Sequence, residues 1–294
     1  MNRVTFRITA SILYLISLLP FPVLYFFSDI LYIFLYYIIK YRRKVVLNNL
    51  LNSFPEKSRS EIEQIEKRFY RYLADLMLES VKTISISADE IKKRFVFKNL
   101  DIMKTYLQNG RSVIAVSGHY GNWEWGPVAI GLELGEKVLV VYKPLSDKRF
   151  EELMNSMRSR FGSIMVPMKQ TLRKVFEYKS EPNVLVLIGD QTPTREESRY
   201  FTSFLNQQTA VFLGVEKIAL KLKNPIVYFS INRIKRGYYE CVIKSLIDTP
   251  EQTMDHEITE AHTRELEKNI RFQPEYWLWS HKRWKFSPEN LKND

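Results

Sequence analysis

The sequence has very little cysteine, histidine or glycine for its length. Its 294 residues include one cysteine, Cys241, with four histidines and ten glycines. A single cysteine excludes an intramolecular disulfide framework and is typical of a reducing, cytoplasmic compartment. The sequence also contains no Gly-x-Ser-x-Gly nucleophile elbow and no His-Glu-x-x-His or Cys-x-x-Cys pattern for zinc. These absences argue against an elbow-type serine hydrolase and a zinc enzyme, and we expect no metal ligands.

Acidic residues are too few to balance the basic ones. Lysine and arginine together number 44 against 33 aspartates and glutamates, which gives a net charge of +11. Such a surface attracts polyanions: nucleic acid, anionic lipid, a phosphorylated substrate or an acidic carrier protein. The charge does not choose among these partners.

One long apolar stretch, residues 4–39, dominates the N-terminus. Pro20 and Pro22 divide it into two pieces, each near or below the roughly 20 residues that a spanning helix requires. The stretch does not end in the small residues of a cleaved signal peptide, and basic residues flank both of its ends. Basic flanks favour a shallow hairpin or interfacial anchor, which we predict over residues 1–44. Asp29 lies inside the second piece and leaves an alternative open, in which the stretch forms a pair of apolar helices in the protein core.

The rest of the chain, residues 45–294, alternates short apolar runs with helical patterns. We expect strands at residues 112–117, 137–142, 183–188 and 225–231, with 238–243 as a partner of the last. We expect helices at residues 147–161, 171–178, 214–222 and 255–272, besides a capped amphipathic helix that begins at Ser58. This alternation predicts an α/β sandwich with a mostly parallel central sheet flanked by helices.

A histidine and a glutamate, His119 and Glu124, follow the first of these strands. In a continuous helix, five residues would rotate the two side chains roughly 140° apart, so they can meet only if the backbone turns. Gly118 and Gly121 supply that turn, because glycine accepts the positive φ that other residues resist, and Asn122 can cap the helix that follows. We therefore expect Glu124 to accept a hydrogen bond from one ring nitrogen, which leaves the other to take a proton. The alternative is an ordinary loop histidine and an ordinary first-turn carboxylate.

Two further polar sites lie at the ends of elements. Asp190 follows the apolar run 184–188, and the ends of neighbouring strands converge on one crevice. Its alternative interpretation is a plain turn residue. Arg158 and Arg160 end a predicted helix, where they could stabilise an oxyanion or bind a phosphate. The competing interpretation is a solvated pair of cations at the negative end of the helix dipole.

Tryptophan occurs in only two places, beside His119 and in residues 277–284. Aromatic rings interleaved with Lys and Arg could stack on nucleic-acid bases. The apolar N-terminus favours a membrane surface or a packed lid instead.

Taken together, these residues resemble the late acyltransferases of lipid A biosynthesis, the lauroyl and myristoyl transferases of the lysophospholipid acyltransferase superfamily. The resemblance covers nearly the whole chain. The motifs that carry it are the apolar N-terminus, Asn49-Leu50, Phe54-Pro55-Glu56, the His-x4-Glu signature in 118–124, and the segments 141–145, 158–162, 190–191 and 277–284. His-x4-Glu alone is a weak signal, but the ordered set is specific.

The resemblance implies transfer of a fatty acyl chain from an acyl carrier protein thioester to a hydroxyl of a lipid A precursor. It implies no metal, no other cofactor and no covalent acyl-enzyme. His119 would be the base, Glu124 its ring partner, Arg158 a stabiliser of oxyanion or phosphate, and Asp190 the second acidic position. We expect substrate contacts from further residues of the same motifs: Asn122, Trp123, Lys143, Arg160 and Gln191.

The same resemblance implies a place at the bacterial inner membrane, with the active site on the cytoplasmic face. The expected partners are the carrier protein, the bilayer and the lipid acceptor, and not nucleic acid. Thr192-Pro193-Thr194 departs from the family pattern, in which an acidic residue is expected after Asp190-Gln191. That departure leaves another glycolipid, a lysophospholipid or an aminolipid open as the acceptor.

Two remoter alternatives remain at this point. One is a non-catalytic membrane or nucleic-acid binding protein, which only the charge and the aromatic residues favour. The other is a metal-dependent hydrolase that uses His119, Glu124 and Asp190, and it predicts a bound metal.

Overall fold

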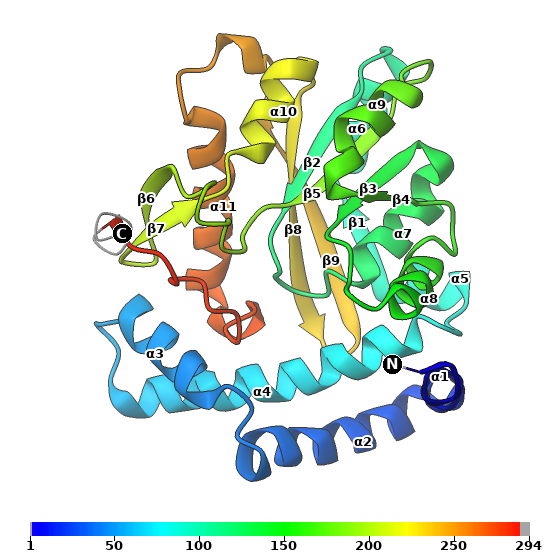
Figure 1. The fold of residues 1–294 in the computed structure, drawn as a ribbon, viewed down its shortest axis with the longest axis vertical. Coiled ribbons are helices and arrows are strands. Elements are labelled where there is room, and N and C mark those ends of the chain that lie inside the picture. The colour runs from blue at the N-terminus through cyan, green and yellow to red at the C-terminus, as the bar shows by residue number, and fades with distance from the viewer. Residues whose placement is uncertain (1, 289–294) are drawn as a thin grey trace.

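A seven-stranded mixed sheet forms the centre of the molecule (Figure 1). The structure, a computed structural model, describes residues 2–288, apart from the side chain of residue 136. Residue 1 of the expected N-terminal anchor and residues 289–294 of the expected main domain lie outside the described residues. The strand order is β1 (Phe95–Lys98), β9 (Tyr238–Ile247), β8 (Ile226–Lys235), β2 (Val113–Ser117), β5 (Val184–Ile188), β3 (Val138–Tyr142) and β4 (Ile164–Pro167). Neighbours are parallel except for the antiparallel pair β8–β9. The predicted α/β fold with a mostly parallel sheet is confirmed.

Helices cover both faces of this sheet because its central strands are apolar on both sides. Along β2, Val113 and Ala115 pack in a cluster with α5 (Ala88–Arg94), α6 (Asp101–Gln108) and α7 (Trp125–Leu134). Ile114 and Val116 point to the other face, where the cluster includes α9 (Thr171–Glu177), α10 (Gly214–Leu222) and α11 (Glu257–Phe272). Helix α8 (Lys148–Arg158) lies beside α7, and a short hairpin, β6 (Tyr200–Phe204) with β7 (Gln207–Val211), stands apart from the main sheet.

The longest helix, α4 (Arg59–Lys82), supports one end of the sheet. It begins with the predicted capping box, in which the side chains of Ser58 and Glu61 bond each other's backbone N–H groups. A separate aromatic cluster joins α4 and α3 (Arg43–Ser53) to the C-terminal segment, where Trp277 and Trp279 are buried. The aromatic residues near the C-terminus thus include core residues, which favours the packed lid over stacking on bases.

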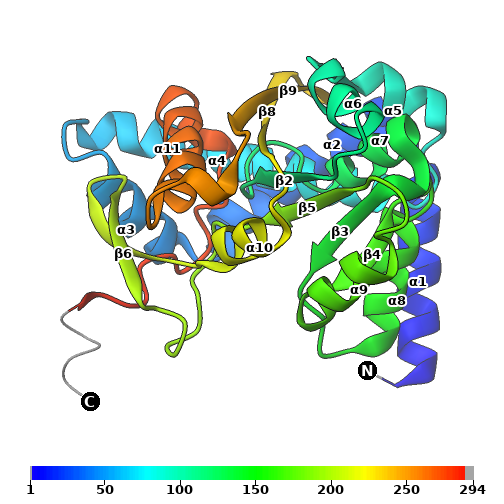
Figure 2. The same cartoon turned by 90° about the horizontal axis from the view of Figure 1, so that it is seen from above.

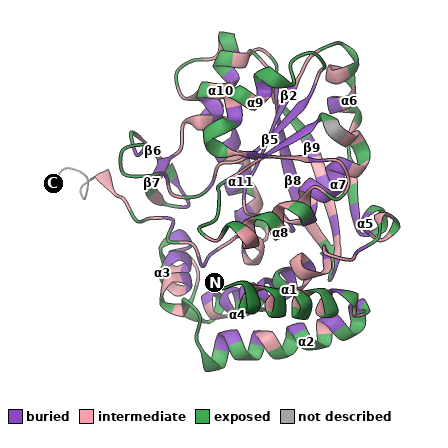
Figure 3. Cartoon of the chain, turned by 45° about the vertical axis from the view of Figure 1, so that its right-hand side comes forward, coloured by how far each residue is buried: buried purple, intermediate pink, exposed green. Residues whose placement is uncertain are grey.

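The apolar N-terminus forms two helices that lie against this body. α1 (Arg3–Leu18) is seen end-on in Figure 1 and along its length in Figure 2, whereas α2 (Phe21–Ile33), extended by a π-helical turn over Phe34–Ile38, runs beside α4. One stretch of the described residues, Phe21–Ile38, is long and apolar enough to cross a membrane by length and composition alone. Both helices keep a broad exposed surface (Figure 3).

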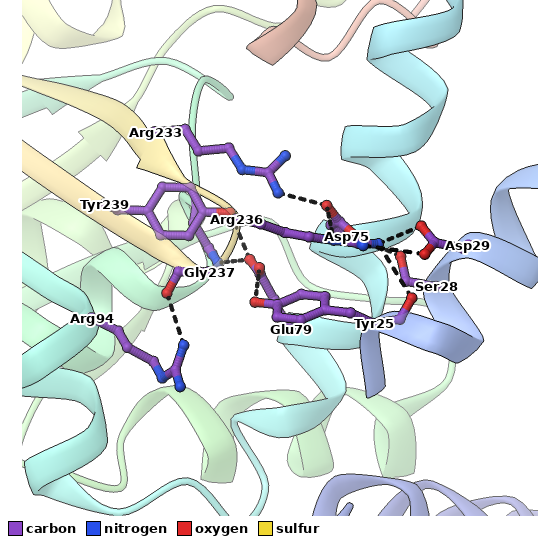
Figure 4. Close-up of polar contacts among 11 residues, drawn as sticks. Tyr25, Ser28, Asp29, Asp75, Glu79, Arg94, Arg233, Arg236, Gly237 and Tyr239 are labelled. Carbon is purple, nitrogen blue, oxygen red and sulfur yellow. Dashed lines mark hydrogen bonds and ion pairs between the residues drawn. The ribbon is translucent and has the colours of Figure 1, made fainter. Parts of the chain in front are cut away.

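A partly buried polar network fixes α2 to α4 and to the β8–β9 hairpin (Figure 4). Ser28 donates to Asp75 at 2.6 Å, and Asp29 pairs with Arg236, which also reaches Asp75 at 2.6 Å. Asp29, the acidic residue that argued for core helices over a membrane anchor, is thereby paired with Arg236 of the β8–β9 hairpin. Glu79 accepts hydrogen bonds from Tyr25 at 2.8 Å and from Tyr239 at 2.6 Å.

Candidate active site

Two strand ends meet at the middle of the sheet. β2 lies next to β5 with Ser117 opposite Ile188, and two residues beyond each position stands a site residue, His119 or Asp190. The connection from β2 to β3 crosses β5, and the connection from β5 to β8 crosses β2. The two connections therefore leave this pair of neighbouring strands in opposite directions. In α/β folds, ligands bind in the crevice at such a switch point.

His119 is paired with Asp190. Its Nδ1 lies 2.6 Å from Oδ1 of Asp190, and its backbone N–H donates to Oδ2 at 2.9 Å. Because an ionised carboxylate only accepts hydrogen bonds, Nδ1 carries the proton and Nε2 keeps a lone pair. Nε2 lies 3.2 Å from the side-chain nitrogen of Gln191, which donates to it.

Glu124 has a different partner, which corrects the expectation that it would hold the ring of His119. Both of its carboxylate oxygens bind Arg158, at 2.9 Å from Nε and 2.8 Å from Nη2. Glu124 directly precedes α7, and Arg158 ends α8, so two helix ends bring this pair together. A bidentate guanidinium–carboxylate pair has fixed geometry, which holds Arg158 beside the histidine.

Two glycines make the loop after β2 possible, each in its own way. Gly121 has φ +61°, and a Cβ there would lie 2.3 Å from the carbonyl oxygen of Ile231. Gly118 allows close approach instead of a turn, since a Cβ would meet Leu266 at 2.7 Å and Oδ2 of Asp190 at 3.3 Å. The expectation that both glycines would supply positive φ therefore holds for Gly121 only.

The two members of the pair influence each other's ionisation. Burial lowers the pKa of His119, but the charge of Asp190, its hydrogen bond and the charge of Glu124 outweigh burial, and the net pKa is raised. Burial raises the pKa of Asp190, but the charge of His119 and hydrogen bonds from His119 and Trp277 bring that pKa below its ordinary value. The pair therefore combines an ionised carboxylate with a ring that gains a proton readily.

A cleft of about 610 Å³ opens beside the pair. It includes His119, Glu124 and Arg158, together with three of the expected contact residues, Trp123, Lys143 and Gln191. Its apolar lining consists of Pro127, Val140, Val141, Pro144, Leu145, Phe150, Met154, Met165, Met168, Ile188, Pro193 and Phe212. The cleft thus combines polar groups from the strand ends with an apolar wall made of these side chains.

Two expected contact residues bond other parts of the protein instead. Asn122 is buried: its amide nitrogen donates to Glu79 at 2.7 Å, and its oxygen accepts from the backbone N–H of Trp125 at 2.9 Å. Arg160 donates from Nη1 to the carbonyl oxygens of Thr83 and Ile86, at 2.6 and 2.9 Å. Neither residue lines the cleft, because these bonds direct both side chains toward α4 and the residues after it.

The C-terminal segment completes the site, and its residues were missed as site residues. Trp277 donates from Nε1 to Oδ2 of Asp190 at 2.8 Å, and the backbone N–H of Leu278 donates to the carbonyl oxygen of His119 at 3.2 Å. Nε2 of His281 accepts from the backbone N–H of Thr192 at 3.0 Å; burial lowers the His281 pKa to about 4, so the ring is neutral. The available signals were the tryptophan-rich composition of 277–284 and the place of this segment among the motifs that carry the family resemblance.

Neither the thiol of Cys241 nor a metal cluster among the described residues contributes to this site. Cys241 is buried, and burial raises the pKa of its thiol. Among residues 2–288, no group of three or more His, Cys, Asp or Glu side chains is placed to hold a metal ion.

Comparison with known proteins points to one family. A family model described as bacterial lipid A biosynthesis acyltransferase matches residues 2–286. The lipid A biosynthesis palmitoleoyltransferase of Escherichia coli (strain K12) is 24% identical over 282 residues, which cover 95% of this chain and 90% of that protein. A lipid A biosynthesis acyltransferase of Shigella flexneri has the same identity and coverage. Another, from Haemophilus influenzae, is 24% identical over 248 residues, 82% of this chain and 74% of that protein.

Proposed function

The chain belongs to the bacterial lipid A biosynthesis acyltransferase family, whose members are O-acyltransferases, and from this premise we propose its reaction. A fatty acyl chain moves from an acyl carrier protein thioester to a hydroxyl of a lipid A precursor, with His119 as general base. The observation that carries this proposal is the His119–Asp190 pair beside an apolar cleft.

In the first step, the acceptor hydroxyl replaces the Gln191 amide at Nε2 of His119. As its oxygen attacks the thioester carbon, its proton passes to Nε2. The ring becomes an imidazolium, which the charge of Asp190 stabilises across the 2.6 Å contact. The intermediate then collapses, the carbon–sulfur bond breaks, and the proton on Nε2 passes to the departing thiolate.

Arg158 is suited to the oxygen that becomes negative. Glu124 occupies two of its guanidinium nitrogens, Nε and Nη2, which leaves the Nη1 N–H groups for an oxyanion or a phosphate of the acceptor. Glu124 is thus a positioning residue for Arg158 in this proposal.

The apolar wall of the cleft suits the acyl chain. Its side chains are aliphatic, aromatic or thioether groups, and a pocket of about 610 Å³ falls within the usual range of ligand sites. Lys143 at the cleft and the net charge of +11 favour an acidic carrier protein and a phosphorylated lipid. The exposed apolar faces of α1 and α2 favour attachment to a membrane surface, and we assign this surface to the cytoplasmic face of the bacterial inner membrane.

The test is acyl transfer by the purified protein from acyl carrier protein thioesters to a tetra-acylated lipid A precursor. We expect transfer by the wild type and a loss of at least about 100-fold in His119→Ala. His256→Ala is the matched control, since His256 precedes α11 and does not line the cleft. An unchanged rate in His119→Ala would falsify the assignment of the base.

A further inference from the structure

A small cavity lies behind Asp190. Its volume is about 10 Å³, close to what a single water molecule requires. Residues at its wall include Asp190, Tyr228, His262 and Arg283. Asp190 therefore borders this cavity while its carboxylate holds His119.

Two of the buried residues that line this cavity carry nitrogen atoms without a hydrogen-bond partner among the described residues. Arg283 is only 4% exposed, and neither its Nε nor its Nη1 bonds another described residue. His262 is 5% exposed, and its Nε2 likewise has no partner among the described residues. Burying a guanidinium without hydrogen bonds is costly, so these atoms call for a ligand in the cavity.

The charges around the cavity make Asp190 the counter-ion of Arg283. Burial lowers the pKa of Arg283 to about 10, against the opposing effect of Asp190, so the guanidinium stays charged at neutral pH. Burial lowers the pKa of His262 to about 4, so that ring is neutral. His281 is neutral for the same reason, and Tyr228 keeps its proton because burial raises its pKa.

We propose that Arg283 is a positioning residue that faces Asp190 across one bound water molecule and opposes protonation of His119 before substrate binds. This inference rests on the proposed role of His119 as the base. The water would accept hydrogen bonds from Arg283. It would donate one hydrogen bond to the carboxylate of Asp190 and one to Nε2 of His262. The buried cation would thus fix the carboxylate from the side opposite the ring.

The physical reason lies in the charges that face His119. Asp190 and Glu124 both favour the imidazolium, whereas Arg158 opposes it. A base protonated before substrate arrives cannot accept a proton, so its pKa must not rise far above the working pH. A second cation behind Asp190 opposes protonation of the ring and keeps the base ready.

The experiment is a pH profile of kcat/KM for acyl transfer by the wild type, Arg283→Met and Arg283→Lys. Arg283→Met should move the acid limb upward by roughly 0.5–1 pH unit, because one neighbouring charge that opposed protonation is lost. Arg283→Lys keeps the charge and should bring the limb back toward the wild-type position. Lys282→Met is the matched control, because it removes an exposed charge one residue away and should not move the limb.

A loss of rate in Arg283→Met with the limb at its wild-type pH would overturn the electrostatic role. Arg283→Gln gives the same readout if the methionine variant does not fold. A high-resolution crystal structure of the wild type should contain a water within hydrogen-bond distance of Arg283, Asp190 and His262. A cavity without such a water, or a water that does not contact Asp190, would contradict the bridge. The proposed function fails separately, through a wild-type profile with no acid limb or an active His119→Ala.

Discussion

At the level of single residues, we predict different losses of activity when each of the two carboxylates near His119 is replaced by its amide. Asp190→Asn keeps the shape but removes the charge that stabilises the imidazolium, so kcat should fall about 10³-fold or more. Because the Asp190 charge raises the His119 pKa, its removal lowers that pKa, and the acid limb should move to lower pH. Glu124→Gln should cost only about 10–100-fold, through a less firmly held Arg158.

Steady-state kinetics of both variants across pH measures this difference. The acid limb should move to lower pH in Asp190→Asn and to higher pH in Arg283→Met, so the effects of the two charges can be separated. A larger loss and a larger downward shift in Glu124→Gln than in Asp190→Asn would show that Glu124 holds the ring, as the spacing of the motif suggested.

The sequence predicted which residues lie near one another better than it predicted which of them pair. His119, Asp190, Glu124 and Arg158 were all predicted to take part, because each stands at the end of an element. Their pairing depends on which strand lies beside which, and the partner of His119 is 71 residues away. A single sequence does not contain strand order, so the nearer carboxylate, Glu124, was chosen as the ring partner.

At the level of elements, strong patterns were recognised and weak ones were missed. The predicted strands near β2, β3, β5, β8 and β9 each contain an apolar run. The β6–β7 hairpin was missed because its turn, Leu205-Asn206, has two residues with positive φ but no glycine. β1 was missed because its four residues are stabilised by parallel pairing with β9, more than 140 residues later.

Helix α2 gives a prediction at the same level. Tyr25 is the α2 residue that donates to the buried Glu79, so Tyr25→Phe leaves one oxygen of that carboxylate without this donor. The free energy of unfolding should fall by about 1–3 kcal/mol, measured as a lower midpoint of thermal unfolding. Tyr14→Phe, on the exposed surface of α1, is the control and should leave the midpoint in place. Equal midpoints for the two variants would mean that the network does not hold α2.

At the level of the whole molecule, α1 and α2 reverse the usual pattern of a surface helix. Apart from Tyr14, the large exposed side chains of α1 recur every three or four residues: Val4, Ile8, Ile12, Leu15 and Leu18. Those of α2 and its extension do the same: Val23, Phe26, Phe27, Ile30, Ile33, Phe34, Tyr37 and Ile38. The inner side of α2 is bonded to α4, so its outer apolar side needs another partner. Helices fixed to the body in this way favour attachment at the membrane surface over a separate spanning segment.

Such an attachment predicts that single charges on the outer face of α2 release the protein from lipid. Phe26 is 63% exposed, and Phe26→Asp should weaken binding to vesicles of anionic phospholipid about tenfold or more, since burial of a Phe contributes about 1.5–3 kcal/mol. The matched control is Phe176→Asp, which makes the same substitution at an exposed position of α9, far from α2. Phe176 is 49% exposed, and this variant should bind vesicles as the wild type does. Vesicle sedimentation at low and high salt measures both, because salt weakens the attraction of +11 charges but not apolar insertion. If high salt alone releases the wild type, or if both variants bind equally, the attachment is electrostatic and the apolar faces of α1 and α2 do not enter the bilayer.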